Sequence, residues 1–272
     1  FVHGRLTGDR GLRYPIGGEV PKCRRDSLKP KTKANTPAHN RRAVFRHEEL
    51  QQVFNHTAWQ GCLSAGRRHS GGTSTIKDSR YWVPLILAYT GARRAEIAGL
   101  LTDDLETIDG IPCVHVRANN YRGIKGEGAE IEKNRIIPVH PHLIDLGLLD
   151  HKGDPKQTGL LFPDVLPKKR KKGPKEYQKA VGKIGESLDD FWRKSLRLNL
   201  DGNPRALCMH SLRHYVNHQL IHADGVHEVT RFDLLGHIES GDAAGSINTS
   251  TYRDDTDVAV KLKAIETLKQ EF

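Results

Sequence analysis

The last third of the chain groups side chains that could together break and re-form a phosphate ester. These residues are His210, Arg213, His214, His237 and Tyr252. A guanidinium group binds phosphate oxygens through paired hydrogen bonds, and an imidazole transfers protons near neutral pH. A tyrosine hydroxyl can act as a covalent nucleophile. The combination therefore indicates chemistry at a phosphate group.

Four short motifs carry these residues, together with a second arginine upstream. In chain order they are TGARRAEI over Thr90–Ile97, HSLRH over His210–His214, LGH over Leu235–His237, and Thr251-Tyr252. Together the motifs resemble those of the tyrosine recombinase (phage-integrase) family, over about residues 43–262. One such motif would be weak evidence, whereas four in this order are a specific signal.

The resemblance implies DNA strand cleavage and rejoining through a 3′-phosphotyrosyl intermediate, without a metal, a cofactor or ATP. It places six residues in catalysis, which are Arg93, Lys125, His210, Arg213, His237 and Tyr252. The arginines would stabilise the charge of the transition state, and the tyrosine would be the nucleophile. Of the histidines, His210 would accept the tyrosine proton and His237 would orient the phosphate. Glu96 and His214 would support the site.

Two lysines compete for one catalytic position. In the family, a lysine on a β-hairpin donates a proton to the leaving 5′-oxygen. Lys125, ahead of Arg135–His140, resembles the lysine of the family's lysine–arginine–proline run, although Gly126–Glu130 then looks like an insertion. Lys133 is the rival, but it lies very close to Arg135. Lys125 is therefore preferred, and both assignments stay open.

A row of histidines offers a different reading of the same segment. His210, His214, His218 and His222 recur four residues apart, a spacing at which two histidines can bind zinc on one helix face. A hydrolytic zinc site also needs a base such as the glutamate of an HExxH motif, whereas Ser211 follows His210. A metal-dependent nuclease is therefore the weaker hypothesis.

The chain is strongly basic. It has 43 lysines and arginines against 33 aspartates and glutamates, and its formal net charge is +10. An acidic partner is expected, with double-stranded DNA the leading candidate. The basic residues considered for DNA contact are Lys133, Arg135, Lys168, Lys169, Arg170, Lys171 and Lys172. The run 168–172 is equally well explained as a solvated loop.

The sequence carries no mark of secretion or of a membrane span. Its four cysteines are scattered without a CxxC pair, which argues against a zinc ribbon or a disulfide framework. No apolar run approaches the roughly 18 residues of a membrane span, and no signal-peptide pattern opens the chain. With the resemblance, this predicts a cytoplasmic, nucleoid-associated protein of a prokaryote.

Hydrophobic periodicity predicts mostly helices. The predicted helices cover residues 41–56, 81–89, 93–101, 141–149, 177–198, 210–222, 226–235 and 258–272. Asp109-Gly110 joins two short apolar runs, which predicts a β-hairpin over 105–116, and Ile136–Val139 predicts a third strand. Residues 64–79 are interpreted as a loop. The predicted fold is mainly α with a small antiparallel sheet, which the resemblance identifies with a tyrosine recombinase catalytic domain.

The domain boundaries follow from composition and from the resemblance. Residues 1–40 are rich in glycine, proline and basic residues, which predicts a linker or an N-terminal arm. Residues 41–272 would form the catalytic domain, and the family's upstream core-binding domain is expected to be missing from this chain. The chain begins at Phe1 and its only methionine is Met209, so it is expected to be a fragment.

The expected function is site-specific recombination that integrates or excises a mobile element, by a homo-oligomer that assembles as a tetramer on DNA. The last helix would pack on its own domain or dock on a neighbouring protomer. Two alternatives remain. One is a DNA-relaxing enzyme similar to type IB topoisomerases. The other is a non-catalytic DNA-binding module of the same fold, in which Tyr252 would be an ordinary half-buried tyrosine.

Overall fold

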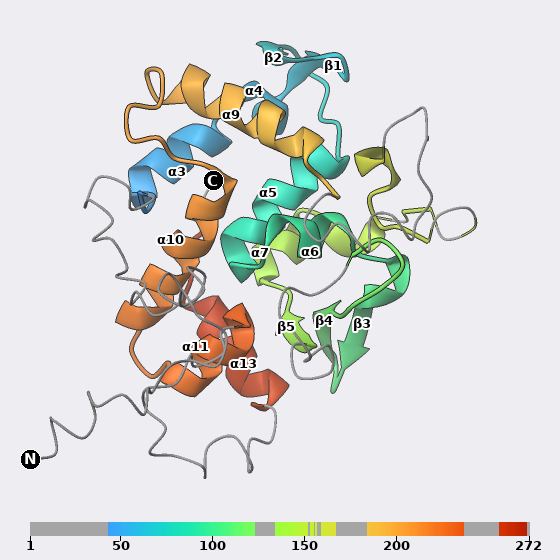
Figure 1. Ribbon diagram of the computed structural model, residues 1–272, viewed down its shortest axis with the longest axis vertical. Coiled ribbons are helices and arrows are strands. Elements are labelled where there is room, and N and C mark those ends of the chain that lie inside the picture. The colour runs from blue at the N-terminus through green and yellow to red at the C-terminus, as the bar shows by residue number, and fades with distance from the viewer. Residues whose placement is uncertain are drawn as a thin grey trace, which may run out of the picture. The chain divides into compact units, whose positions relative to one another are not determined.

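The fold is built around α5 (Ser79–Thr90), a helix in which every residue except Arg80 is buried. Its sequence is apolar on all sides, as expected of a helix inside a core. Asp78 caps the first turn by accepting a hydrogen bond from the Arg80 N–H, and Gly91 ends the helix in the left-handed conformation. The helices with the most extensive packing against α5 are α6 (Arg94–Ala98), α9 (Ser187–Asn199) and α10 (Met209–His222) (Figure 1).

The computed structural model describes residues 43–122, 134–151, 153–154, 156, 159–166, 184–236 and 256–270, all within the unit Arg42–Phe272. In these residues the fold is mainly helical with small antiparallel sheets, which confirms the predicted fold class. None of the helices in this part of the chain is both long and apolar enough to cross a membrane.

A three-stranded antiparallel sheet lies at one edge of the helices, in the order β3 (Leu105–Ile108), β4 (Ile111–Val116) and β5 (Arg135–Pro138) (Figure 1). Asp109 and Gly110 form the turn between β3 and β4 with φ of 51° and 80°. Positive φ at both central residues is what a tight hairpin turn of this kind requires. The predicted hairpin and the third strand are therefore confirmed.

A second, two-stranded sheet replaces part of the predicted loop over 64–79. It pairs β1 (Cys62–Ser64) with β2 (Arg67–Gly71). Both strands are largely exposed, so they lack the alternating apolar pattern by which strands are recognised in a sequence. The buried Arg68 holds the hairpin instead, because it donates hydrogen bonds to the carbonyls of Ala65 and Ile76 and pairs with Asp78.

Several predicted helices are shorter than their apolar patterns suggested. The remaining elements are α3 (His47–Phe54), α4 (Thr57–Gln60), η2 (Thr102–Asp104), α7 (Pro141–Asp145), η3 (Leu148–Asp150), η4 (Pro163–Val165), α11 (Glu228–Leu235) and α13 (Val258–Glu266). The helix predicted over 93–101 ends at Ala98, because Leu101 pairs with Leu160 as an isolated β-bridge. The helix predicted over 141–149 divides at Gly147, which is left-handed.

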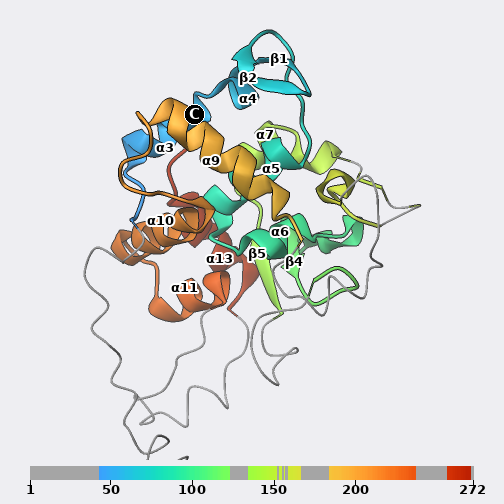
Figure 2. The same ribbon diagram turned by 45° about the horizontal axis from the view of Figure 1, so that its top comes forward.

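The last described helix packs on its own chain. α13 contacts β5 and α11, and it lies beside both in the two views of the molecule (Figures 1 and 2). Ala264 and Ile265 are its buried apolar residues, and Leu268, just after the helix, is also buried. The backbone oxygen of Leu268 lies 3.2 Å from Nε2 of the buried His140, which follows β5.

Gly91 occupies a position that admits no side chain. Its φ is 60°, and a Cβ there would lie 2.5 Å from Cδ2 of Leu235 and 3.1 Å from Cβ of Val216. Gly91→Ala is expected to lower the free energy of unfolding by about 2–4 kcal/mol, from left-handed strain plus overpacking. Urea unfolding measures this. Gly225→Ala is the matched control, because its φ is 76° and open space surrounds it. An equal loss in both variants would contradict the close approach.

Candidate functional site

A buried carboxylate, Glu96, gathers two arginines at the start of α6. It is 3% exposed. Its Oε1 accepts a hydrogen bond from Nη1 of Arg93 at 2.9 Å, and its Oε2 accepts one from Nη2 of Arg135 at 2.6 Å. The backbone N–H of Arg93 also donates to Oε2, at 2.8 Å. Glu96 therefore accepts a hydrogen bond from the N-cap residue of its own helix while it fixes two guanidinium groups.

The charge of Glu96 is stabilised by these partners. Burial alone would raise the pKa of the carboxyl group, but the charges and hydrogen bonds of Arg135 and Arg93 outweigh it and lower the pKa to about 2. The group is thus a carboxylate at neutral pH. It provides the negative charge that lets buried guanidiniums lie close together.

Arg213 reaches the same cluster from α10. It is 4% exposed, and its Nη1 donates to the backbone oxygen of Gly91 at 2.7 Å, a bond that joins the HSLRH motif to the TGARRAEI motif. Its Nη2 is buried and has no hydrogen-bond partner in the described residues. Burial, followed by the charges of Arg93 and Arg135, lowers the pKa of Arg213 to about 9, so the guanidinium stays protonated at neutral pH.

Arg135 is a third arginine of the cluster, held by β5. It is 5% exposed, and its Nε donates to the backbone oxygen of Leu234 at 3.0 Å. Its Nη1 is buried without a partner among the described residues. The sequence suggested only a DNA contact for Arg135. Its burial was not foreseeable, because the strand gives no sign that Glu96 lies opposite.

The cluster carries more positive than negative charge. Among the described residues, Arg93, Arg135 and Arg213 surround one carboxylate, that of Glu96, and the buried Nη1 of Arg135 and Nη2 of Arg213 have no hydrogen-bond partner there. Unsatisfied buried donors are costly, and guanidinium groups favour oxyanions with paired acceptor oxygens. The arrangement can therefore bind a phosphoryl group and stabilise extra charge on its oxygens.

A further buried arginine, Arg122, supports Glu96 through its backbone oxygen. Arg122 is fully buried and donates through Nη1 to the backbone oxygen of Glu96 and through Nη2 to Oδ2 of Asp104 at 3.2 Å. Arg117 donates to Oδ1 of the same aspartate at 2.8 Å. Burial lowers the pKa of Arg122 to about 10. Sequence reasoning missed Arg122 and Asp104, since charged residues near turns are normally solvated.

Two motif histidines lie on α10 within one turn of Arg213. The rings of His210 and His214 are half-buried, with centroids 4.9 Å apart and planes at 88°. The rings of His218 and His222 are exposed and 4.5 Å apart. Among the described residues there is no group of three or more side chains arranged to hold a metal ion.

Tyr215 is close to the motif residues but is part of the core. It is buried, and its hydroxyl oxygen lies 3.1 Å from Nδ1 of His47. This hydroxyl is therefore engaged inside the fold, away from solvent.

The remaining site residues of the sequence analysis lie outside the described residues. They are Lys125, Lys133, Lys168, Lys169, Arg170, Lys171, Lys172, His237 and Tyr252. The residues that flank the last two are described. Gly236 ends α11 with φ of 63°. Thr256 donates to the Asp233 carboxylate of α11 through its hydroxyl and, at 3.3 Å, through its backbone N–H. The two ends of segment 237–255 are thus both tied to α11.

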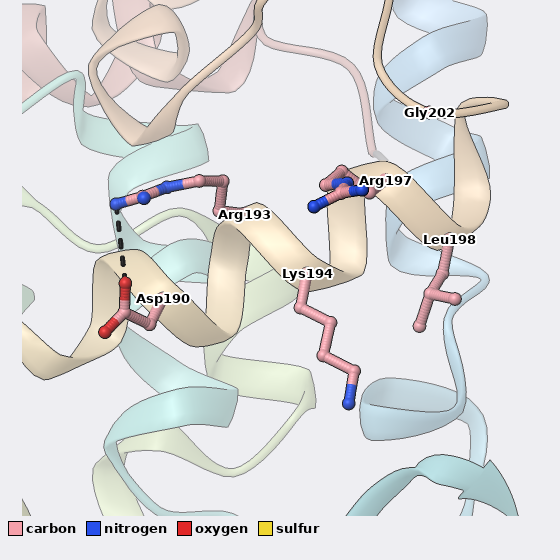
Figure 3. A pocket seen from close by; sticks show the side chains of 6 residues that line it. All are labelled: Asp190, Arg193, Lys194, Arg197, Leu198 and Gly202. Carbon is pink, nitrogen blue, oxygen red and sulfur yellow. Dashed lines mark ion pairs between the residues drawn. The ribbon is translucent and has the colours of Figure 1, made fainter.

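The exposed face of α9 carries a further concentration of positive charge. A groove with a volume of about 460 Å³ is lined by Asp190, Arg193, Lys194, Arg197, Leu198 and Gly202 (Figure 3). Asp190 pairs with Arg193 at 3.4 Å, and Leu198 is 55% exposed. The lining therefore has three cationic side chains and one anionic side chain.

Comparison with known proteins gives structural likenesses only. No protein-family model matches the chain, and no curated protein matches it. The solved structures that resemble it are integrases and site-specific recombinases. An integrase from mycobacterium phage Brujita is 17% identical, with 84% of this chain and 59% of that chain covered and a TM-score of 0.45.

Two further structures are similar at the same level. The XerH site-specific recombinase bound to a palindromic difH substrate is 19% identical, with 77% and 51% of the two chains covered and a TM-score of 0.49. The XerA recombinase is 16% identical, with 93% and 64% covered and a TM-score of 0.44. The chain therefore spans about half to two thirds of the length of these three proteins.

The low pKa of Glu96 makes a stability prediction. Because its pKa falls from 4.5 to about 2 on folding, its contribution is fully present above pH 4.5 and is lost as pH falls through 2. Glu96→Gln is expected to lower the free energy of unfolding by about 3 kcal/mol at pH 7 and to flatten its decline below pH 4.5. Urea unfolding from pH 7 to pH 2 tests this, with the exposed Glu266→Gln as control. A variant as stable as the wild type would contradict the central role of Glu96.

Proposed function

We propose that this chain is the catalytic part of a tyrosine-type site-specific DNA recombinase. The observation that carries the proposal is the cluster of Arg93, Arg135 and Arg213, of which Arg135 and Arg213 are buried. Its excess positive charge, and its buried N–H groups without a partner among the described residues, favour an oxyanion. The transition state for attack on a phosphodiester concentrates negative charge on the non-bridging oxygens. Guanidinium groups fixed in advance by Glu96 and Gly91 would stabilise that state more than the ground state.

The proposed reaction conserves the phosphodiester energy. The Tyr252 hydroxyl attacks the phosphorus, its proton passes to His210, and a tyrosine–phosphorus bond forms as the bond to the 5′-oxygen breaks. The leaving oxygen takes a proton from the hairpin lysine, for which Lys125 is preferred. Attack of a 5′-hydroxyl on the phosphotyrosine reverses these steps and rejoins the strand, so ATP is not needed.

The described geometry supports His210 as the proton acceptor. It precedes Arg213 by three residues on α10, and residues at this spacing are neighbours on a helix surface. It is half-buried, whereas Arg213 is buried. A phosphate held by the Arg213 guanidinium would thus lie near an imidazole that solvent can also reach.

The tethering of Thr256 supports delivery of the nucleophile by the same chain. Tyr252 precedes Thr256, which is bonded to Asp233 of α11. Four residues span at most about 14 Å. The chain length alone thus limits the separation of Tyr252 from Thr256. Because Asp233 is next to Leu234, which contacts Arg135, we propose that Tyr252 serves the arginine cluster of its own protomer.

Three wider parts of the proposal rest on the motif resemblance. The substrate is double-stranded DNA, bound by a homo-oligomer that becomes a tetramer. The biological reaction is integration or excision of a mobile element. The protein acts in a prokaryotic cytoplasm, at the nucleoid.

The groove on α9 is proposed to contact the DNA backbone. Its cations Arg193, Lys194 and Arg197 are exposed and suited to phosphate neutralisation. Arg197→Ala is expected to reduce the slope of log affinity against log salt by about 1 and to leave cleavage at saturating protein unchanged. Fluorescence anisotropy over a salt series measures the slope. Lys269→Ala, an exposed cation on the C-terminal segment, is the control, and an equal change in both variants would remove the groove from the interface.

The proposed chemistry predicts a covalent adduct. The protein is incubated in EDTA with a pool of nicked duplexes of random sequence, and DNA that stays attached after denaturation is recovered on gels. The wild type is expected to form an adduct, and Tyr252→Phe is expected to form none. Tyr215→Phe is the matched control and should retain the adduct, since that hydroxyl is buried against His47.

The outcomes of this experiment separate the functions. Selection of one sequence from the pool supports a recombinase, whereas adducts without sequence preference, with relaxation of supercoiled plasmid, favour a topoisomerase-like enzyme. An adduct that persists in Tyr252→Phe moves the nucleophile to another residue. DNA binding without an adduct in any variant favours the non-catalytic module.

A further inference from the structure

We propose that Arg135 is a positioning residue that fixes the end of α11, at Leu234 and Gly236, against the Arg93–Glu96 pair. This inference rests on the function proposed above. It changes the role of Arg135 from a surface contact with DNA to an internal brace. It follows from three separate contacts of one guanidinium group.

The first two contacts join elements that are distant in sequence. Nη2 of Arg135 donates to Oε2 of Glu96 at 2.6 Å, and Nε donates to the backbone oxygen of Leu234 at 3.0 Å. That oxygen belongs to the last turn of α11, where helix carbonyls lack partners within the helix. Arg135 thus caps α11 and pairs with α6 at the same time. A cation at a helix C-terminus is also favoured by the helix dipole.

The third contact explains why residue 236 is glycine. Gly236 has φ of 63°, and a Cβ there would lie 2.9 Å from Nη1, 3.1 Å from Cζ and 3.3 Å from Cδ of Arg135. The backbone turn after α11 therefore lies directly on the guanidinium plane. The position of Gly236 at the end of α11 therefore depends on where Arg135 is held.

The burial of Arg135 argues against a role on the surface. The residue is 5% exposed, and two of its three guanidinium nitrogens are committed to Glu96 and Leu234. Its backbone is also held in place, because β5 is paired with β4. Arg135 is therefore better suited to fix the positions of neighbouring elements than to contact a DNA backbone.

Arg135→Lys tests the proposal. A lysine keeps the positive charge beside Glu96 but lacks the planar guanidinium group that donates to Glu96 and Leu234 at once. Adduct formation at saturating protein is expected to fall by about 10²-fold, as for a misplaced catalytic group, while DNA affinity changes by no more than about threefold. The slope of affinity against salt should stay unchanged. Lys269→Ala, an exposed cation outside both the arginine cluster and the α9 groove, is the control and should change neither the rate nor the slope. A reduced salt slope with an unchanged rate in Arg135→Lys would instead assign Arg135 to DNA contact and overturn the proposal.

A double-mutant cycle tests the contact with Gly236 itself. Gly236→Ala is expected to slow adduct formation, and the variant that combines it with Arg135→Lys should be no slower than the slower single variant, because both act through one contact. If the rate reductions of the two single variants instead multiply in the double variant, the two residues do not act through one contact.

The same cycle is also measured by urea unfolding, which does not depend on any activity. Gly236→Ala should lower the unfolding midpoint more in the wild type than in Arg135→Lys, where the guanidinium is absent. If the wild type forms no adduct, the proposed function fails, and this cycle still decides whether Arg135 fixes the turn. Equal shifts in the two backgrounds would overturn the proposal.

Discussion

The pairing of Glu96 with its arginines is the interaction on which the site depends. Two unit charges 4 Å apart interact by about 4 kcal/mol at an effective dielectric constant of 20, so buried guanidiniums cannot gather without a counter-charge. Glu96 supplies that charge to Arg93 and Arg135 through separate oxygens, and its backbone oxygen accepts a hydrogen bond from Arg122. One short helix thereby fixes side chains from β5, from its own N-terminus and from the loop after β4.

Glu96 neutralises only part of the positive charge of its arginine neighbours. One carboxylate faces three guanidiniums, and Arg213 is stabilised mainly by a backbone oxygen, that of Gly91. Strain and unsatisfied groups of this kind collect at functional sites and are balanced by the surrounding fold. Here the surrounding fold is the apolar helix α5, which supplies Gly91, and α10, which is packed against it. Within the described residues, the cluster therefore presents guanidinium N–H groups whose positive charge one carboxylate only partly neutralises.

Local signals were sufficient to predict much of the fold. α5 and α10 follow from apolar spacing, and the turn at Asp109-Gly110 follows from residue type, because these features depend on neighbours in sequence. The β1–β2 hairpin was missed because its strands are exposed and its stability depends on Arg68 reaching Asp78. The motifs identified Arg93, Glu96 and Arg213, which the structure brings together.

Burial of charge could not be predicted in the same way. Arg135 and Arg122 look like solvated residues in the sequence, and their partners Glu96 and Asp104 are distant along the chain. The roles of Lys125, His237 and Tyr252 stay predictions, since these residues lie outside the described part of the chain. What the structure adds is the reason why Gly236 and Thr256, on either side of His237 and Tyr252, are held where they are.

The most direct test of the account is to locate the covalent bond. The protein–DNA adduct would be digested with protease and nuclease, and the peptide that keeps a nucleotide would be identified by mass spectrometry. The account predicts a nucleotide joined through its 3′-phosphate to the peptide that contains Tyr252. A nucleotide joined to another residue, or joined through a 5′-phosphate, would contradict it.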